Sequence, residues 1–364
     1  MITPSFWRER RVLLTGHTGF KGAWTALVLQ RLGAQVTGFA HAAGDSNDLF
    51  VLARVADGMD HRVGDVRDLD QLARTIDDTG SEIVLHMAAQ SLVGLSYVEP
   101  ALTYATNVMG TVHVLEAARR AQGVRAVVVV TSDKCYENLG TQSHRESDRL
   151  GGHDPYSSSK ACAELVTSAY RDSFLADGQC KVASVRAGNV IGGGDWARDR
   201  LVPDVMRAFL AGKPARIRRP GAVRPWQHVL DPVMAYLGLA QRLVERGDVA
   251  EAWNFGPGPA GEQSVGDIVE ELASRWSAGA RWESDPEPGF LEAELLSLDC
   301  SKAADRLGWH PLFDLPTALD MTVAWYQTFQ RKQDVRALAL DQISAALAKL
   351  VRAPAAGRPV ETTQ

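Results

Sequence analysis

Two residues able to exchange a proton stand four positions apart, Tyr156 and Lys160, in the run HDPYSSSKACAELV. Side chains four apart on a helix lie on the same face. A phenol has an ordinary pKa near ~10 and is a poor base at neutral pH, but a neighbouring ammonium lowers that pKa by stabilising the phenolate. The same spacing also occurs by chance on solvent-facing helices, so the pair needs support from elsewhere in the chain.

Three further polar residues, Ser132, Asp133 and Lys134, follow the apolar run VVVVT. The serine hydroxyl could hydrogen-bond the same substrate hydroxyl as Tyr156. Oxidation and reduction need only Tyr, Lys and a hydroxyl residue, whereas elimination of water also needs one group to remove a proton and another to protonate the leaving hydroxyl. A neighbouring carboxyl and amine supply both. The alternative is an exposed Asp–Lys pair at a strand end, with little effect on anything.

A glycine-rich turn, TGHTGFKGAW, follows the apolar run VLLT and places Gly16, Gly19 and Gly22 at the start of a predicted helix. These glycines permit a tight turn, close approach of backbone to a pyrophosphate, and close packing of the helix on the sheet. The helix start supplies free N–H groups for the anion. The loop is predicted to bind a dinucleotide through Thr18, Phe20 and Lys21 as well as its glycines; a ligand-free turn is the alternative. Together with Tyr156 and Lys160 it is typical of short-chain dehydrogenases.

The residues after the next two apolar runs bear on the choice of dinucleotide. GFAHAAG has neither an acid for a ribose 2′-hydroxyl nor an arginine for a 2′-phosphate, so NAD is only weakly favoured over NADP. Asp65, in GDVRD (64–68), follows a third predicted strand and could reach an adenine amino group. An aspartate capping the helix predicted from residue 68 is equally consistent with this position.

The elements that position these residues alternate as strands and helices. Buried strands are predicted at 12–15, 36–39, 83–86, 127–131 and 182–186, and helices at 20–32, 68–78, 99–122 and 155–176. This alternation predicts an α/β fold, a Rossmann-type doubly wound parallel sheet with a smaller C-terminal α/β substrate domain. The predicted division is 1–190 for the dinucleotide-binding domain, to which later segments return, 191–350 mainly for substrate binding (with helices at 202–212 and 228–246), and 351–364 as a disordered tail.

Composition narrows the class of protein. The chain has 364 residues and a formal net charge of −5, which argues against a nucleic-acid partner. It contains no apolar run long enough for a membrane span and no apolar leader, and the four cysteines are scattered. The nine histidines lack metal-site spacing. We therefore expect a cytoplasmic protein with reduced thiols, no metal, no membrane contact and no nucleic-acid partner.

The motifs taken in order resemble the bacterial CDP-glucose 4,6-dehydratases, nucleotide-sugar dehydratases of the extended short-chain dehydrogenase/reductase type, from about residue 5 to about 350. The most restrictive matches are TGHTGFKG and SDKCYEN; others are GDVRD, HMAAQSLVGLSY, TYATNVMGTVHVLEA, RAGNVIGGGDWARDR, RPWQHVLDP and LDCSKAADRLGWHP. Related dTDP-glucose dehydratases carry Asp-Glu where this chain has Asp133 and Lys134, and lysine there is typical of the CDP-sugar branch.

The resemblance implies a reaction and a set of contacts. Tyr156 takes the O4 proton while the C4 hydride passes to NAD+, a base near Lys134 removes the C5 proton, Asp133 protonates the departing C6 hydroxyl, and the hydride returns to C6. The implied additional cofactor contacts are Asp65, Val66, Ala88, Ala89, Gln90, Asn107 and Thr131. The implied contacts to the nucleotide sugar are Ser91, Asn189, Arg200 and Arg224, with Arg216, Arg218 and Arg219 interpreted as a solvated rim. Helices 99–122 and 155–176 commonly form a four-helix homodimer interface in this superfamily.

Several positions depart from the usual pattern. Relatives usually carry Arg at Gly94, an aromatic-rich stretch at 139–144, His at Leu291 and Lys at Ser297. One hypothesis is therefore an unchanged reaction with an altered hexose or nucleotide preference. Two other hypotheses are a nucleotide-sugar 4-epimerase or reductase, for which Asp133 and Lys134 would be dispensable, and a dinucleotide-sensing protein without catalysis, which would not need the tyrosine, lysine and serine together.

Overall fold

A seven-stranded parallel sheet forms the centre of the computed structural model, which describes residues 2–137, 143–176, 178–277, 279–285 and 296–352. Its strands, in the order β10-β6-β5-β4-β1-β2-β3, are β1 (Arg11–Thr15), β2 (Gln35–Ala40), β3 (Asp60–Val63), β4 (Ile83–His86), β5 (Ala126–Val130), β6 (Lys181–Ala187) and β10 (Ala252–Phe255). The predicted doubly wound α/β fold is confirmed, and each apolar run predicted as a strand is one.

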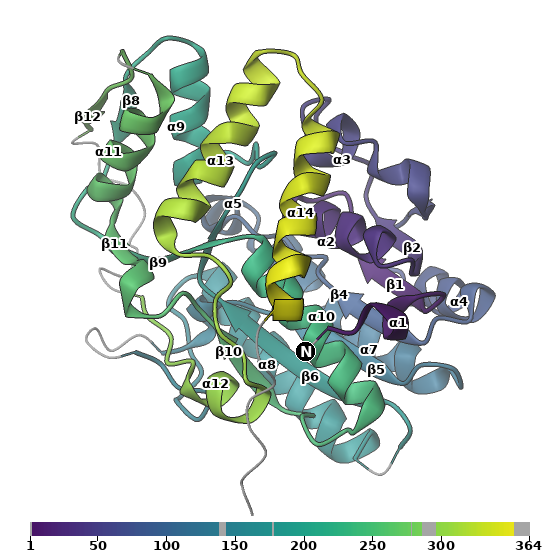
Figure 1. Ribbon diagram of the computed structural model, residues 1–364. Helices are drawn as coiled ribbons and strands as arrows, with labels where there is room; N and C mark the ends of the chain where they lie inside the picture. Colours follow the sequence, from purple (N-terminus) through teal and green to yellow (C-terminus); the bar gives the residue numbers. More distant parts are fainter. Residues whose placement is uncertain (1, 138–142, 177, 278, 286–295, 353–364) are drawn as a thin grey trace, which may run out of the picture.

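Helices cover both faces of this sheet (Figure 1). On one face lie α2 (Phe20–Arg31) and α10 (Leu230–Glu245), and on the other lie α4 (Leu69–Thr79), α7 (Gly110–Arg120) and α8 (Pro155–Phe174). Alternate residues of a strand point to opposite faces, so Val12 and Leu14 join the first core while Leu13, between them, joins the second. A sheet covered on both faces explains why its strands read as unbroken apolar runs.

Two segments from late in the chain complete the central sheet and its helical cover. β10 pairs with β6, and α10 packs on β5 and β6. Helix α10, which corresponds to the predicted helix 228–246, therefore covers the central sheet. The division of the chain at residue 190, with later segments returning to the first domain, stays a prediction.

A smaller part lies beyond the carboxyl ends of the strands, toward the upper left in Figure 1. It contains a three-stranded sheet, β11-β9-β7, and a two-stranded sheet, β12-β8. Its elements are β7 (Asn189–Ile191), α9 (Leu201–Leu210), β8 (Ala215–Ile217), β9 (Val223–His228), β11 (Glu262–Ser264), α11 (Val265–Trp276), β12 (Trp282–Ser284) and α13 (Leu315–Gln330).

The predicted helix 99–122 is not uniform. It consists of α6 (Pro100–Tyr104), the π-helical turn η2 (Ala105–Met109) and α7. Elements that the sequence did not indicate are α1 (Pro4–Trp7), α3 (Leu49–Leu52), η1 (Val55–Gly58), α5 (Val93–Val98), η3 (Asp133–Cys135), η4 (Pro259–Gly261), α12 (Ser301–Leu307) and α14 (Val335–Arg352). Because α14 reaches Arg352, the predicted tail begins two residues too early; 353–364 lie outside the described residues.

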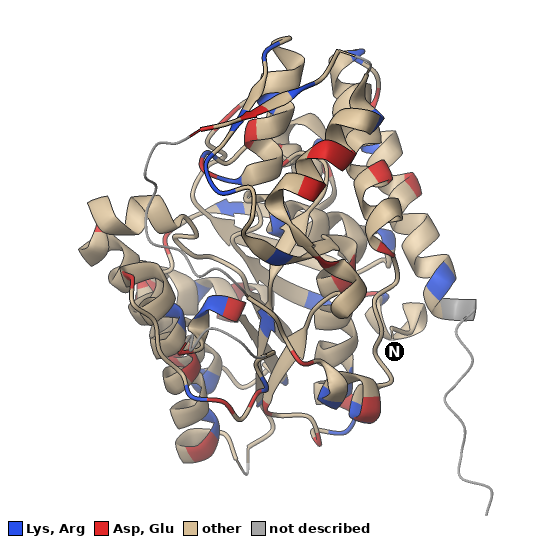
Figure 2. Ribbon diagram, turned by 90° about the vertical axis from the view of Figure 1, so that its left-hand side faces the viewer, with Lys and Arg blue, Asp and Glu red and all other residues tan. Residues whose placement is uncertain are grey.

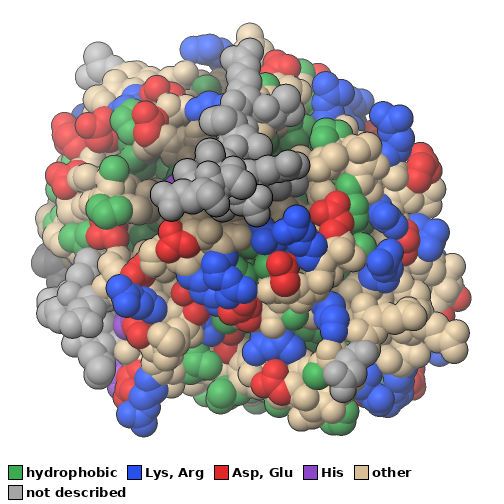
Figure 3. Space-filling model, turned by 60° about the horizontal axis from the view of Figure 1, so that its bottom comes forward, with side chains coloured by type: hydrophobic (Ala, Val, Ile, Leu, Met, Phe, Trp, Pro, Cys, Tyr) green, Lys and Arg blue, Asp and Glu red, His purple; other side chains and the backbone are tan. Residues whose placement is uncertain are grey.

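Charged residues of both signs are intermixed over the molecule. Figure 2 shows acidic and basic positions side by side along the ribbon, and the face in Figure 3 carries neighbouring Lys, Arg, Asp and Glu with hydrophobic side chains scattered between them. Through the described parts of the chain, no helix is both long and apolar enough to cross a bilayer.

Candidate active site

A cavity of about 710 Å³ opens at the carboxyl ends of the central strands. It lies where β1 and β4 are neighbours, which is where the chain switches from one half of the sheet to the other. Open α/β sheets bind their ligands at such a switch point. Both parts of the molecule line the cavity, the sheet through the loops after β1, β4 and β5, and the smaller part through β7, α9, β8 and β9.

The glycine loop has the conformation that a dinucleotide requires. Gly16 has φ +75°, and a Cβ there would lie 2.6 Å from the backbone nitrogen of Ala88. A Cβ on Gly22 would lie 2.1 Å from the carbonyl oxygen of Gly16. Helix α2 begins after Gly19, whose position provides no side-chain cap, so its first N–H groups are available to an anion. The loop therefore fits a pyrophosphate.

Asp65 lies at the far side of this loop, on the cavity wall. Its carboxylate accepts a hydrogen bond from the guanidinium of Arg67 and lies 3.1 Å from Nε2 of His41. The Arg67 hydrogen bond holds the pKa of Asp65 well below its usual range. The cap of α4 is Asp68, whose side chain accepts from the backbone N–H of Gln71, so the capping interpretation of Asp65 is wrong.

Asn107 is the predicted cofactor residue that the structure places elsewhere. It is buried in the π-helical turn and does not line the cavity. Its amide accepts from the backbone N–H of Gln90 (2.8 Å) and donates to the Gln90 carbonyl (3.0 Å) and the Ser159 hydroxyl (2.9 Å). Asn107 therefore fixes the loop that follows β4 rather than facing a ligand.

Tyr156 and Lys160 occupy the first turns of α8, and both line the cavity. The helix begins here because Asp154 accepts from the backbone N–H of Ser157 (2.9 Å) and Pro155 occupies the first turn. The Lys160 ammonium donates to the carbonyl oxygen of Val130 at the end of β5, 3.2 Å away. The helix and the strand end are thus fastened together beside the cavity.

The sequence-based expectation was that the Lys160 ammonium lowers the pKa of the Tyr156 phenol, and the pKa values of this pair differ from it. Burial raises the pKa of Tyr156 to about 12, although the Ser132 hydrogen bond and the charge of Arg200 act in the opposite direction. Burial also lowers the pKa of Lys160 to about 8. The protein's own groups therefore do not lower the pKa of the phenol, and a further cation beside the ring is needed to do so.

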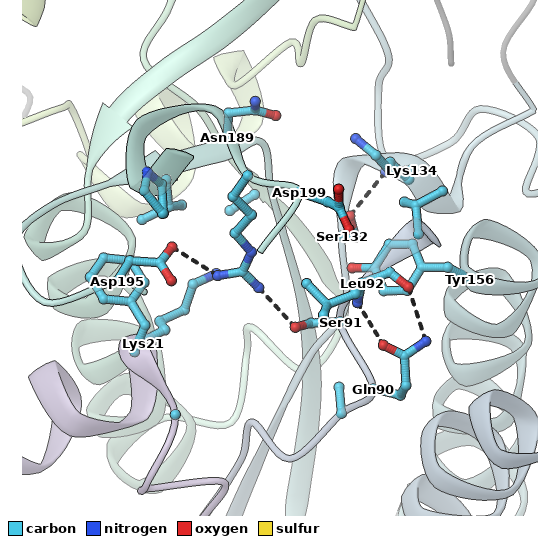
Figure 4. A pocket seen from close by; sticks show the side chains of 18 of the residues that line it. Lys21, Gln90, Ser91, Leu92, Ser132, Lys134, Tyr156, Asn189, Asp195 and Asp199 are labelled. Atoms are coloured by element: carbon cyan, nitrogen blue, oxygen red, sulfur yellow. Dashed lines mark hydrogen bonds and ion pairs between the residues drawn. The ribbon is translucent and has the colours of Figure 1, made fainter. Parts of the chain in front are cut away.

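Asp133 and Lys134 face the same cavity. Both line it, together with Tyr156 and Lys160, and η3 is the turn that carries them. Figure 4 shows Ser132 and Lys134 on the same side of the cavity as Tyr156. Asp133 is 3% exposed; its Oδ1 accepts from the Ser132 hydroxyl (2.9 Å), while Oδ2 is buried and has no partner among the described residues. A buried carboxylate oxygen of this kind calls for a donor from a ligand. The interpretation as a solvent-exposed pair is wrong.

A buried ion pair supports these groups from behind. Glu164, one turn after Lys160, accepts from Arg186 (2.8 Å), from Ser184 (2.6 Å) and from the hydroxyl of Thr131. Arg186 also donates to the Tyr136 hydroxyl (2.7 Å), immediately after η3. One network therefore joins α8 to the turn that carries Asp133 and Lys134. Thr131 lines the cavity as predicted, but its hydroxyl is committed to this network.

On the opposite side, two short loops are bridged by Arg200. Its guanidinium donates to Asp195 (2.9 Å) and to the hydroxyl of Ser91 (2.8 Å). Figure 4 shows Asp195 and Lys21 across the cavity from Lys134 and Tyr156. Since Arg200 is only partly buried and extends along the cavity wall, it is available to an anionic ligand as well.

The cavity brings together almost every predicted site residue. Those that line it are Gly16, Thr18, Gly19, Phe20, Lys21, Gly22, Asp65, Val66, Ala88, Ala89, Gln90, Ser91, Thr131, Ser132, Asp133, Lys134, Tyr156, Lys160, Asn189, Arg200 and Arg224. The lining residues that the sequence analysis missed include His41, Asp195, Asp199 and Asp204. The last three stand in or beside the quoted run GGGDWARDR, whose acidic residues were the available signal. Arg216, Arg218 and Arg219 also line the outer wall, Arg216 with a largely exposed side chain.

The four departures from the family pattern fall in different places. Gly94 lines the cavity. Ser297 does not; it is buried and hydrogen-bonded to the Ser143 hydroxyl (2.6 Å) and to Glu262. Leu291 and residues 139–142 lie outside the described residues. Only Gly94 therefore changes a described wall of the site.

No group of three or more His, Cys, Asp or Glu side chains is placed to hold a metal ion within the residues that the structure describes. The described cysteines, Cys135, Cys162, Cys180 and Cys300, are all free thiols.

Comparisons with known proteins agree with this geometry. Residues 12–256 match the model of the NAD dependent epimerase/dehydratase family. The chain is 46% identical to CDP-glucose 4,6-dehydratase from Salmonella typhimurium over 351 residues, which are 94% of this chain and 98% of that one. A dTDP-glucose 4,6-dehydratase structure from Streptomyces venezuelae with NAD bound superimposes with a TM-score of 0.74 at 27% identity, covering 89% of this chain and 99% of that one. A UDP-glucose 4-epimerase from Thermotoga maritima (TM-score 0.78, 24% identity, 88% and 99% covered) shares the fold. The chain belongs to the NAD dependent epimerase/dehydratase family.

Proposed function

We propose that this protein is an NAD-dependent hydro-lyase that converts CDP-D-glucose to CDP-4-keto-6-deoxy-D-glucose and water. The observation that carries the proposal is the placement of Ser132, Asp133, Lys134, Tyr156 and Lys160 around one cavity that also contains the glycine loop. The 46% identity to a CDP-glucose 4,6-dehydratase over nearly the whole chain supports the same substrate.

The cofactor would be held by the glycine loop, the first N–H groups of α2 and the wall around Asp65. When bound, NAD+ would supply the hydride acceptor for C4 and, once reduced, the hydride donor for C6. Tyr156 would need the positive charge of the nicotinamide as its further cation, because burial raises the pKa of the phenol to about 12. Tyr156 takes the O4 proton, with Ser132 hydrogen-bonded to the same hydroxyl.

Asp133 and the group at Lys134 carry out the elimination. The 4-ketone makes the C5 proton acidic, and the amine of Lys134 in its neutral form would accept it and return it to C5 when C6 receives the hydride. Asp133, with one oxygen already bonded to Ser132 and the other without a partner, donates the proton that lets the C6 hydroxyl leave as water. Asn189, Arg200 and Arg224 would hold the diphosphate, for which planar guanidinium groups are suited.

An epimerase or reductase is the second candidate, since the fold is shared with a UDP-glucose 4-epimerase. Neither reaction needs a buried carboxylate next to the serine with one oxygen that has no partner among the described residues, which is why dehydration is preferred. The test is incubation of the purified protein with NAD and CDP-glucose, followed by mass spectrometry. Loss of 1 water (~18 mass units) from the sugar nucleotide supports dehydration; an unchanged mass with an inverted C4 would contradict it.

Whether the nucleotide or hexose preference has changed is a separate question. Only Gly94, among the departures whose position is described, lines the cavity. Turnover of CDP-, dTDP-, UDP- and GDP-glucose measured side by side decides it. A clear preference for CDP-glucose would rule out the altered-preference hypothesis.

The protein is proposed to act as a homodimer through the helices around α8. Apolar side chains are exposed on this face at Leu95, Tyr104, Met109 and Leu165, the last with 59% of its surface accessible. A second copy packing against them would bury this surface. Replacing Leu165 with Glu should convert a dimer to a monomer in sedimentation experiments; a monomeric parent protein would contradict the proposal.

The free thiols suit the expected cytoplasmic location, which cell fractionation would test.

A further inference from the structure

The outer end of the cavity is lined differently from the end that holds the reacting groups. The first turn of α9 contributes Leu201, Val202, Pro203 and Asp204, and nearby segments contribute Ile217, Ala222 and Val265. These mostly apolar walls suit a planar ring. Because the sugar must lie beside Tyr156 for the proposed reaction, the nucleobase of the same substrate has to occupy this outer end.

The polar groups at this end are of two kinds. Arginines 216, 218, 219 and 224 suit a diphosphate, whereas the carboxylates of Asp199 and Asp204 would repel one. A carboxylate oxygen at this end would instead suit a part of the substrate that donates hydrogen bonds. On a pyrimidine base, cytosine offers an amino group at C4, while uracil and thymine offer a carbonyl oxygen there.

Of the two carboxylates, Asp204 is better placed to accept a hydrogen bond from the base. Its Oδ1 accepts from the guanidinium of Arg207, which also donates to the backbone carbonyls of Trp196 (2.8 Å) and Ala197 (3.3 Å). The carboxylate is thus held in one orientation, and its Oδ2 accepts no hydrogen bond from any described residue. Asp199, by contrast, is more exposed, and the nearest guanidinium, that of Arg218, is 3.8 Å away.

We propose that Asp204 determines the nucleotide specificity, its free carboxylate oxygen accepting a hydrogen bond from the C4 amino group of cytosine and opposing the C4 carbonyl of uracil or thymine. The inference rests on the proposed function, since it assumes a nucleotide sugar in the cavity. Accepting from the cytosine amino group is an established role for aspartate and glutamate. Opposing a carbonyl with a carboxylate adds rejection of the wrong base to attraction of the right one. Desolvation raises the pKa of Asp204, although 45% of its side chain is exposed.

The first experiment uses the unaltered protein. Dissociation constants are measured by calorimetry for CDP, N4-methyl-CDP, N4,N4-dimethyl-CDP and UDP. The monomethyl base keeps one amino hydrogen and controls for added bulk, so it should bind nearly as well as CDP. The dimethyl base has no such hydrogen and should bind as weakly as UDP, roughly 10- to 100-fold below CDP. Equal affinity for dimethyl-CDP and CDP would overturn the proposal, as would equal affinity for UDP and CDP.

The second experiment compares Asp204→Asn with the matched variant Asp199→Asn. An asparagine amide can donate to a carbonyl or accept from an amino group, so Asp204→Asn should lower the ratio of kcat/KM for CDP-glucose over UDP-glucose roughly 10- to 100-fold. The change should appear in KM rather than kcat. Asp199→Asn should leave this ratio within about 2-fold. An unchanged ratio in Asp204→Asn, or an equal change in Asp199→Asn, would overturn the assignment.

The two proposals can fail separately. If no sugar nucleotide gives a 4-keto product, the proposed function fails whatever the affinities are. If product forms but affinity does not depend on the amino hydrogens of the base, the function stands and the role of Asp204 fails.

Discussion

The inner and outer ends of the cavity contrast in how firmly their charged groups are held. At the inner end the reacting side chains are almost completely buried: Asp133 is 3% exposed, Lys160 5% and Tyr156 8%. Lys160 is hydrogen-bonded to the end of β5, and the ion pair between Glu164 and Arg186 joins α8 to β6. At the outer end, Arg216, Arg218 and Asp199 have side chains between 44% and 73% exposed and pair across distances of 3.4 to 3.8 Å.

This contrast suggests how the two ends can change. Buried polar networks allow few arrangements, because each unpaired group is costly. Exposed ion pairs contribute little and can be exchanged with small loss. A site built this way can keep its chemistry while the charged groups at its outer end are exchanged.

The largest effect is expected at the inner end, from Asp133→Asn. The amide cannot donate the proton that the leaving C6 hydroxyl needs, so dehydration should slow roughly 10²- to 10⁴-fold. Oxidation at C4 should persist, visible as absorbance of reduced nicotinamide on mixing with substrate. Asp70→Asn, on the exposed face of α4, is the control. Full turnover in Asp133→Asn would instead favour an epimerase or reductase.

An intermediate effect should appear as a pH-dependent stability in Lys160→Met. Burial lowers the pKa of Lys160 to about 8 from an ordinary value of 10.5. Between these values the unfolded chain carries the proton and the folded chain does not, so stability rises with pH across this window and is lost as pH falls through about 8. Methionine carries no proton, so the free energy of unfolding of Lys160→Met should rise with pH by on the order of 3 kcal/mol less than that of the parent protein. Lys21, whose pKa burial also lowers to about 8, keeps its own contribution in both proteins.

Chemical denaturation of both proteins from pH 7 to pH 10.5 measures this slope. Lys213→Met, at an exposed position, should behave like the parent protein. Parallel stability curves for Lys160→Met and the parent would mean that protonation of Lys160 in the folded protein costs no stability. The contrast between the two ends of the cavity would then weaken.

The smallest effect is expected from Arg216→Gln at the outer end. Arg216 pairs with Glu283 at 3.4 Å, with both side chains more than half exposed. Removing the pair should change the free energy of unfolding by less than ~1 kcal/mol. Thermal melting of Arg216→Gln and of Glu283→Gln would measure it. A loss of several kcal/mol in either variant would show that the outer pairs are structural and would break the comparison.

Much of the inner end could be predicted from the sequence because its signals are local. Apolar runs predict buried parallel strands, and the catalytic candidates stand directly after one of them or four residues apart on one helix. Glu164 continues the four-residue spacing of Tyr156 and Lys160 and could have been found in the same way. Its role could not be predicted, because Glu164 lies on α8 whereas its partners Arg186 and Ser184 lie on the strand β6.

What could not be predicted depends on contacts between distant segments. Asn107 was expected to face a ligand, but the π-helical turn directs its amide to Gln90, and such a turn leaves no pattern in the sequence. Asp204 belongs to the cavity only because α9 and β8 pack side by side. The strand β10 was missed because AWNF is short and precedes a Gly- and Pro-rich stretch.

The late arrival of β10 has a consequence for biosynthesis. This strand completes the sheet beside β6, and α10 covers β5 and β6, yet both are translated after β7, β8 and β9. A nascent chain that ends near residue 190 would present β6 as an open edge with an uncovered apolar face, which invites association with other chains. The segment up to residue 190 is therefore expected to complete its sheet only after the later segments are made, and a fragment that ends there should be recovered mainly as aggregate.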